Sequence, residues 1–340
     1  MARSEITIDL GALRRNVATL LRALDGAELW AVVKANGYGH GALDCARAAL
    51  AAGAHALCVA TVPEALALRA ELADARIVVM GPTWPSELRA ARETRLELVV
   101  SGGAIPEGIP LHLKLDTGMG RWGLSELPAP GGGVVGLMTH LATADTDRAF
   151  AIEQLEVFRA ATEPFAHLTR HAANSAAALR LPESRFDAAR CGIALYGLSP
   201  FGEDPAVDGL EPVLSWRTEI AQSRLLRAGE STGYGRRFVA DQDTWIGILP
   251  LGYADGFRRD LTGTHVLVDG GRCQVVGAVS MDATAIRLDR QLPSGTDVTL
   301  VGPGVPLEEH ARVADTLTYE LACRIDSSPT RASRIVHGPD

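Results

Sequence analysis

Three features are missing from this sequence: a cluster of basic residues, a long apolar run and a secretion signal. Its 340 residues hold no block of lysine or arginine and the formal net charge is -8, so no surface for nucleic acid or an anionic membrane is indicated. No apolar run is long enough to cross a bilayer. Residues 1–6 enter a strand-like segment directly, without a signal's apolar core, which predicts a cytoplasmic protein. We therefore expect a small-molecule ligand and neither a nucleic-acid nor a membrane partner.

Cysteine is also scarce, and its placement does not indicate a disulfide framework. The cysteines are odd in number, far apart and mostly in apolar segments, which favours buried, reduced thiols. No CxxC pair and no cluster of histidine and cysteine has the spacing of zinc ligands, so no metal is expected. The five residues are Cys45, Cys58, Cys191, Cys273 and Cys323.

Apolar segments alternate with alanine-rich helical segments over the first 200 residues. Short, near-continuous apolar runs begin near residues 29, 56, 76, 96, 111, 134, 165 and 188. Eight such runs separated by helices predict an α/β fold, a closed (β/α)8 TIM-type barrel over residues 9–210. An open doubly wound sheet is the alternative. Its G-x-G-x-x-G signature is missing after the first run, where Gly37, Gly39 and Gly41 alternate with other residues.

The pattern changes after about residue 211. Short strands between glycine, proline and aspartate turns are expected at residues 213–226, 244–251, 265–269, 274–279, 283–288 and 298–301, with one helical piece at 307–317. This predicts a second, mostly β domain over residues 211–340. An N-terminal strand within residues 1–8 is expected to join it.

The first apolar run ends in a lysine followed by a glycine-rich turn. Lys34 comes directly after residues 31–33, and Tyr38 offers a hydroxyl four residues later. Desolvation at the end of a buried strand lowers the pKa of an amine, as a lysine that binds an aldehyde cofactor requires. A surface lysine after an ordinary strand would give the same local pattern, so the interpretation depends on the rest of the chain.

Polar residues also follow the later barrel strands. The carboxyl ends of barrel strands form the active site in this fold, so these side chains are expected to share one site. They are Lys114 and Arg121 after the fifth strand, His140 after the sixth, His171, Asn174 and Ser175 after the seventh, and Arg190, Gly192 and Ile193 at the eighth.

These residues lie in ordered motifs through which the chain, from residue 8 to about 324, resembles the alanine racemase family. The resemblance implies a pyridoxal 5'-phosphate barrel followed by a β domain. It also implies interconversion of L- and D-alanine, which supplies D-alanine for peptidoglycan in bacteria. The motifs are AVVKANGYGHG (31–41), LKLDTGMGR (113–121), THLATAD (139–145), HAANSAA (171–177), RCGIALYG (190–197), LGYADG (251–256) and SMD (280–282).

The resemblance also implies two catalytic bases. Lys34 would hold the cofactor and act on the D-side, and Tyr253 would act on the L-side. A tyrosine needs a positive neighbourhood to work as a base, because its ordinary pKa is near ~10. His140 and Arg190 match the residues that provide it, and Arg190 also matches the arginine facing the cofactor's pyridine nitrogen. Pairing of Arg190 with Asp187 is the structural alternative.

Further roles follow from the same resemblance. The hydroxyls of Tyr38 and Ser175 and the backbone N–H groups of Gly192 and Ile193 would bind the phosphate, with Asn174 and His171 in support. Arg121 and the N–H of Met281 would hold the substrate carboxylate, and Lys114, carbamylated in many members, would face Arg121. Since Tyr253 and Lys34 fall in different domains, the resemblance implies a head-to-tail homodimer with composite sites, to which the partner contributes Met281 and Asp282.

Two residues depart from the family pattern, and three alternative functions remain open. Ser327 stands where some members have a tyrosine, and Ala278 where many have an arginine, so a wider entrance and a racemase acting on serine or basic amino acids are possible outcomes. A decarboxylase on a similar barrel would not need LGYADG and Arg190 at these places. A noncatalytic pyridoxal-phosphate carrier would need only the barrel.

Overall fold

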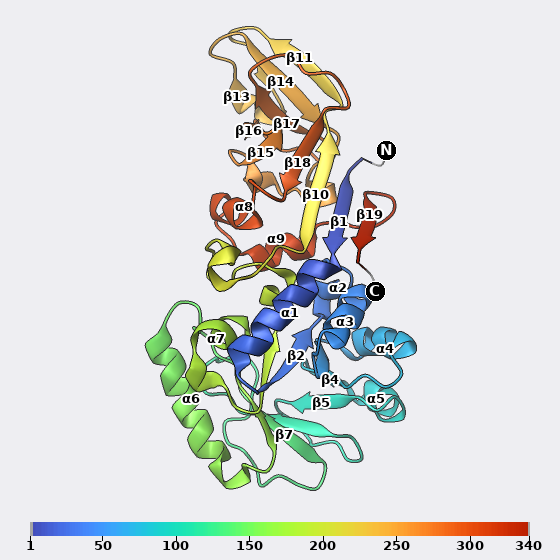
Figure 1. Ribbon diagram of the computed structural model, residues 1–340, viewed down its shortest axis with the longest axis vertical. Coiled ribbons are helices and arrows are strands. Elements are labelled where there is room, and N and C mark those ends of the chain that lie inside the picture. Colours follow the sequence, from blue (N-terminus) through green and yellow to red (C-terminus); the bar gives the residue numbers. More distant parts are fainter. Residues whose placement is uncertain (1–2, 339–340) are drawn as a thin grey trace. The chain divides into compact units, whose positions relative to one another are not determined.

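The computed structural model describes residues 3–338. The chain divides into two compact units, one of residues 12–201 and 205–211 and the other of the N-terminal residues up to 11, 202–204 and the residues from 212 onward. Each unit has its own sheet; in Figure 1 the strands of the second unit are yellow to red, except for β1, which is blue.

The first unit is a closed barrel of eight parallel strands in chain order, which confirms the predicted fold class. β2 pairs with β9, with Glu28 opposite Ala188, and this pairing closes the ring. Most barrel residues are fully buried, because the interior and the surrounding helices cover both faces. The strands are β2 (Glu28–Val32), β3 (Ala56–Val59), β4 (Ile77–Val79), β5 (Glu97–Val100), β6 (Leu111–Lys114), β7 (Val134–Met138), β8 (Thr169–His171) and β9 (Ala188–Cys191).

Helices lie around the barrel (Figure 1). In the first, Leu13, Val17, Leu20 and Leu24 recur at helical spacing and all are buried. The helices are α1 (Leu10–Leu24), α2 (Lys34–Tyr38), α3 (Ala42–Ala51), α4 (Val62–Glu71), α5 (Leu88–Glu93), α6 (Arg148–Thr162) and α7 (Ser175–Arg180).

One barrel strand begins later than expected. The chain forms a 3-10 helix over Glu163–Phe165, and β8 starts at Thr169 rather than near residue 165. Pro164 explains the difference, because its fixed φ and missing N–H suit the first turn of a helix rather than a ladder.

The second unit is built on a nine-stranded sheet. β1 (Glu5–Asp9) pairs antiparallel with β10 and parallel with β19 (Ser333–His337), a strand that the sequence did not predict. The order is β11 (Gln222–Leu226), β14 (Thr244–Leu249), β17 (Thr284–Leu288), β16 (Gly271–Val276), β15 (His265–Val268), β18 (Asp297–Val301), β10 (Leu214–Glu219), β1 and β19. β12 (Ser231–Thr232) and β13 (Phe238–Val239) form a small separate sheet.

Two expected elements of this unit are each divided. The strand expected at 213–226 is two strands, because Ile220 N–H donates to Thr296 O and Ala221 N–H donates to Ile248 O as the chain changes partner. The helix expected at 307–317 is α8 (Leu307–Val313) followed by α9 (Thr318–Arg324). Asp315, with φ of 47°, has left-handed backbone that ends the first helix.

No disulfide joins the five cysteines, all of which lie within residues 3–338, and their burial differs from the expectation at two positions. Cys45, Cys58 and Cys191 are buried, Cys273 is half-buried and Cys323 is exposed on α9. Within residues 3–338, no group of histidine, cysteine and carboxylate side chains could hold a metal ion. No helix in the same range has both the length and the apolar character to span a membrane.

Candidate active site

Lys34 lies two residues after the end of β2, at the carboxyl end of a barrel strand. The next four residues have left-handed backbone, with φ of 51° at Ala35, 53° at Asn36, 63° at Gly37 and 53° at Tyr38. The element labelled α2 is therefore a left-handed turn. Such backbone costs about 1–2 kcal/mol for each residue other than glycine, so neighbouring groups must hold it.

Hydrogen bonds to two neighbouring segments hold this turn. Ala35 N–H donates to Oε1 of Glu64 at 2.7 Å, and Ala42 N–H donates to Oδ1 of Asn36 at 3.0 Å. The other carboxylate oxygen of Glu64 accepts from Thr61 N–H at 3.1 Å in the capping box of α4. Glu64 thus fixes the turn after Lys34 against the start of α4.

Lys34 shares this end of the barrel with Lys114 and His140. Burial, with the charges of Arg190 and Arg121, lowers the pKa of Lys114 to about 8. Burial, with the charges of Arg190 and Lys114, lowers the pKa of His140 to about 3, and Lys34 contributes to both shifts. His140 is therefore neutral near pH 7. Burial and the nearby cations both disfavour protonation of His140.

Arg190 lies on β9 and is 4% exposed. Its Nη1 donates to Nδ1 of His171 at 2.8 Å, and its Nη2 donates to the carbonyl oxygen of Thr139 at 2.8 Å. Burial lowers its pKa to about 10, so it stays charged at neutral pH. The alternative partner, Asp187, instead accepts from Nε of Arg170 at 3.3 Å. Arg190 is thus a buried cation among neutral acceptors, in the described part of the chain.

Three of the expected phosphate ligands converge beside β9. Gly192 N–H donates to Oγ of Ser175 at 3.0 Å. A methyl group added at Gly192 would lie 2.4 Å from the Tyr38 hydroxyl, so only glycine leaves room there. Ile193 begins a buried 3-10 helix next to them. The Oδ1 of Asn174 accepts from Ala177 N–H at 3.0 Å and caps α7, which carries Ser175.

Arg121 lies at the end of a loop that follows β6. Asp116 shapes this loop, because its Oδ1 accepts from the N–H groups of Gly118 at 3.0 Å and Gly120 at 3.1 Å. The guanidinium of Arg121 lies 5.5 Å from the ring centre of Trp122, and both side chains are exposed.

In the β unit, the loops that carry Tyr253 and Met281 are joined. Tyr253 N–H donates to the carbonyl oxygen of Ser280 at 3.1 Å, and a Cβ at Gly252 would lie 2.1 Å from the same oxygen. Tyr253 is 41% exposed and Met281 is 53% exposed. The β unit thus presents both residues at its surface, side by side.

Three other predicted residues of this unit differ in burial and pairing. Asp282 is exposed, accepts from Nη1 of Arg331 at 2.6 Å and lies 3.4 Å from Arg3. Ala278, expected at an entrance, is only 5% exposed in this chain. Ser327 is half-buried.

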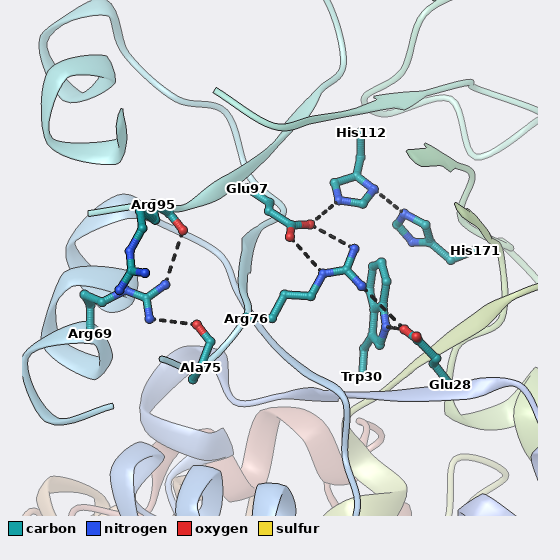
Figure 2. Close-up of polar contacts among 9 residues, drawn as sticks. All are labelled: Glu28, Trp30, Arg69, Ala75, Arg76, Arg95, Glu97, His112 and His171. Atoms are coloured by element: carbon teal, nitrogen blue, oxygen red, sulfur yellow. Dashed lines mark hydrogen bonds and ion pairs between the residues drawn. The ribbon is translucent and has the colours of Figure 1, made fainter. Parts of the chain in front are cut away.

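Polar residues inside the barrel were missed. Figure 2 shows Glu97 bonded to both Arg76 and His112, with His112 reaching His171. The Arg76 guanidinium lies over the ring of Trp30, 4.6 Å from its centre. The sequence did offer a sign of them, because His112 lies within the apolar strand β6 and Glu97 begins the apolar strand β5. The sequence does not show, however, which strand supplies the partner of either side chain.

The carboxyl end of the barrel carries Lys34, the buried Arg190 and a cradle formed by Tyr38, Ser175 and Gly192. These features define the class of the protein, a barrel enzyme with a second, β-rich unit. Two family models match the chain: Alanine racemase, N-terminal domain, over residues 8–200, and Alanine racemase, C-terminal domain, over residues 213–333. The chain belongs to the alanine racemase family, and it is therefore an isomerase.

Individual relatives agree with this assignment. Alanine racemase 1 of Bacillus subtilis (strain 168) is 37% identical, covering 95% of this chain and 91% of its own. The structure of alanine racemase from D-cycloserine-producing Streptomyces lavendulae has a TM-score of 0.91 and 34% identity, over 99% of this chain and 98% of that one. That from Bacillus anthracis with bound L-Ala-P has a TM-score of 0.87 and 32% identity, over 99% and 96%.

Proposed function

We propose that this chain interconverts L- and D-alanine with pyridoxal 5'-phosphate bound at Lys34. The observation that carries the proposal is the grouping of Lys34, Arg190 and the Tyr38–Ser175–Gly192 cradle at one end of the barrel. Membership of the alanine racemase family supplies the substrate and the reaction. The relatives named above are all alanine racemases, and a match to the C-terminal domain model favours a racemase over a carrier built from a barrel alone.

The residues present fit this cofactor. A phosphate needs several convergent donors, and Tyr38, Ser175 and Gly192 lie together beside the 3-10 helix that begins at Ile193. Arg190 can only donate, so it would leave a facing ring nitrogen unprotonated. When bound, the cofactor withdraws electrons from Cα of the amino acid and thereby acidifies its Cα–H bond.

Two residues would move the proton. Racemisation removes a proton from one face of Cα and returns one to the other, so a base is needed on each side. We assign the D-side to the Nζ of Lys34 and the L-side to the phenolic oxygen of Tyr253. Arg121 and the N–H of Met281 would hold the substrate carboxylate, and a carbamate on Lys114 would give Arg121 a negative partner.

The site would be shared between two subunits. Lys34 belongs to the barrel unit, whereas Tyr253, Met281 and Asp282 belong to the β unit. A head-to-tail homodimer would bring the barrel end of one subunit to the β unit of the other. In the cell, this enzyme would act in the cytoplasm and supply D-alanine for peptidoglycan.

The direct test is incubation of the cofactor-loaded protein with L-alanine in heavy water. D-alanine that carries deuterium at Cα would support the proposal. Bound cofactor without exchange or inversion would contradict it. Serine and lysine in the same assay would report whether the range is broader.

Mixing two inactive variants tests the shared site. Lys34→Ala and Tyr253→Phe each remove one base, and random subunit exchange would make half of the dimers hybrid, each with one intact and one doubly deficient site. Activity would then return to about a quarter of the wild-type value. If both bases came from the same subunit, the mixture would stay inactive.

A further inference from the structure

A row of hydrogen-bonded side chains runs through the barrel interior from Arg190 to Glu97. Nη1 of Arg190 lies 2.8 Å from Nδ1 of His171, and Nε2 of His171 lies 3.0 Å from Nδ1 of His112. Nε2 of His112 lies 2.8 Å from Oε2 of Glu97. Figure 2 shows the row from His171 to Glu97. It joins a buried cation to a carboxylate on the opposite side of the ring of strands, through two imidazoles.

The surroundings leave these rings little freedom. Both imidazoles are 0% exposed, and the Trp30 ring lies 4.5 Å from that of His171 and 5.5 Å from that of His112. Gly136 on β7, the strand between β6 and β8, makes the contact possible. A Cβ there would lie 2.1 Å from Nδ1 of His112, so a side chain at 136 would separate the two rings.

The direction of every hydrogen bond in the row is fixed by its ends. A guanidinium can only donate, so Nδ1 of His171 accepts and its Nε2 carries the proton. Nδ1 of His112 then accepts, and its Nε2 donates to Glu97. Burial raises the pKa of Glu97, but hydrogen bonds from His112 and Arg76 outweigh this and lower it to about 2, so the carboxylate accepts as required.

Both imidazoles are neutral, as this order of donors and acceptors demands. Burial lowers the pKa of His171 well below its ordinary value, and Arg190 adds to the shift. Burial also lowers the pKa of His112, against the opposing effect of Glu97. A second proton on either ring would lie on Nδ1 and would face the N–H group that already donates to that atom. The row therefore has one consistent arrangement, in which each bond polarises the next toward the anion.

We propose that Glu97 is a positioning residue for Arg190, acting through His112 and His171. The carboxylate orients His112, which orients His171, whose Nδ1 and carbonyl oxygen together occupy Nη1 of Arg190 at 2.8 Å each. This leaves the guanidinium in one orientation at the carboxyl end of the barrel. The catalytic consequence rests on the proposed function, in which Arg190 faces the cofactor ring nitrogen. The hydrogen-bond row itself does not depend on it.

Glu28 offers a matched control, because it begins β2 as Glu97 begins β5, at the amino end of the barrel. Its Oε2 accepts from Nε1 of Trp30 at 2.7 Å and lies 3.5 Å from Arg76, which also binds Glu97. Glu28→Gln and Glu97→Gln therefore each remove one negative charge beside Arg76. Only Glu97 bonds to an imidazole of the row.

The first test uses the full chain without cofactor, labelled with 15N in its histidines. We expect His112 and His171 to be neutral with the proton on Nε2. In Glu97→Gln the Nε2 proton resonances of both rings should move upfield, although His171 does not touch residue 97, and Glu28→Gln should leave them unchanged. A proton on Nδ1 of either ring in the wild type, or an unmoved His171 in Glu97→Gln, would overturn the proposal.

The second test loads the same variants with pyridoxal 5'-phosphate. We expect kcat for alanine to fall roughly tenfold in Glu97→Gln with KM little changed, a size typical of an outer hydrogen-bond partner, and to stay near wild type in Glu28→Gln. Equal losses in both variants would refute the positioning role. A wild type that shows the expected resonances but no racemisation would refute the proposed function alone. Glu97→Gln keeps one acceptor oxygen for His112, so the variant is expected to fold. If Glu97→Gln does not fold, Gly136→Ala breaks the row at another point.

Discussion

Replacing Gly192 with alanine should weaken cofactor binding by displacing Tyr38. The added methyl would lie 2.4 Å from the Tyr38 hydroxyl and 2.8 Å from its Cζ. Ordinary contact is about 3.5 Å, so the hydroxyl must move by about 1 Å. The ring has little room to do so, because it is 7% exposed and its centre lies 5.1 Å from that of Tyr196.

The expected size follows from the hydrogen bond that is lost. A shift of about 1 Å takes a donor out of hydrogen-bonding range. A hydrogen bond to a charged group contributes about 1.5–3 kcal/mol, which corresponds to a Kd for pyridoxal 5'-phosphate raised about 10- to 100-fold. Overpacking should also lower the free energy of unfolding by about 1–3 kcal/mol.

The assay is titration of the cofactor-free protein with pyridoxal 5'-phosphate, followed by absorbance. Tyr38→Phe removes the same hydroxyl directly, so the double variant should lose less than the sum of the two single losses. Gly102→Ala is the control, because no atom lies within 4 Å of a Cβ at that exposed position. An unchanged Kd in Gly192→Ala would refute the assignment of this cradle to the phosphate.

Three further predictions concern charge and the turn after Lys34. With its pKa lowered to about 8, Lys114 should react with dissolved carbon dioxide increasingly as pH rises from 7 to 9; a 13C carbamate signal should appear with labelled bicarbonate and be absent in Lys114→Gln. The pKa of His140 is about 3 in the folded protein and about 6.5 in the unfolded one, so its contribution to stability is complete above pH 6.5 and decreases as pH falls, by about 2 kcal/mol at pH 5. Urea unfolding of the cofactor-free protein at pH 7 and pH 5 should therefore show a smaller loss of stability at pH 5 in His140→Gln than in the wild type. Equal losses of stability would contradict this. Glu64→Ala should speed hydrogen exchange at Ala35 and lower kcat, whereas Thr61→Ala should cost only the cap, about 1 kcal/mol of stability, and equal exchange in the two variants would count against the role of Glu64.

Much of the fold could be predicted because its signals are local. Near-continuous apolar runs between alanine-rich helices predicted the barrel, and short strands between turns predicted the β unit. The errors occurred where a local signal was weak or was outweighed. Pro164 delayed β8, Asp315 divided a helix, and β19 depends on pairing with β1 from the other end of the chain.

The candidate site was predictable where its residues follow strands in recognisable motifs. The row behind Arg190 was not, because His112 and Glu97 have meaning only through partners on other strands. The same applies to Glu64, whose T-x-x-E signal reads as an ordinary cap. Its second carboxylate oxygen reaches Ala35, 29 residues earlier in the chain.

The left-handed turn after Lys34 has a consequence for synthesis in the laboratory. Ala35, Asn36 and Tyr38 hold φ angles near those that a residue of the opposite chirality prefers. At these positions the mirror-image amino acid would be the relaxed one. A semisynthetic chain with D-alanine at position 35 should therefore be more stable than the natural chain. In the natural chain, L-residues adopt an unfavourable left-handed backbone in the turn that follows the proposed cofactor lysine.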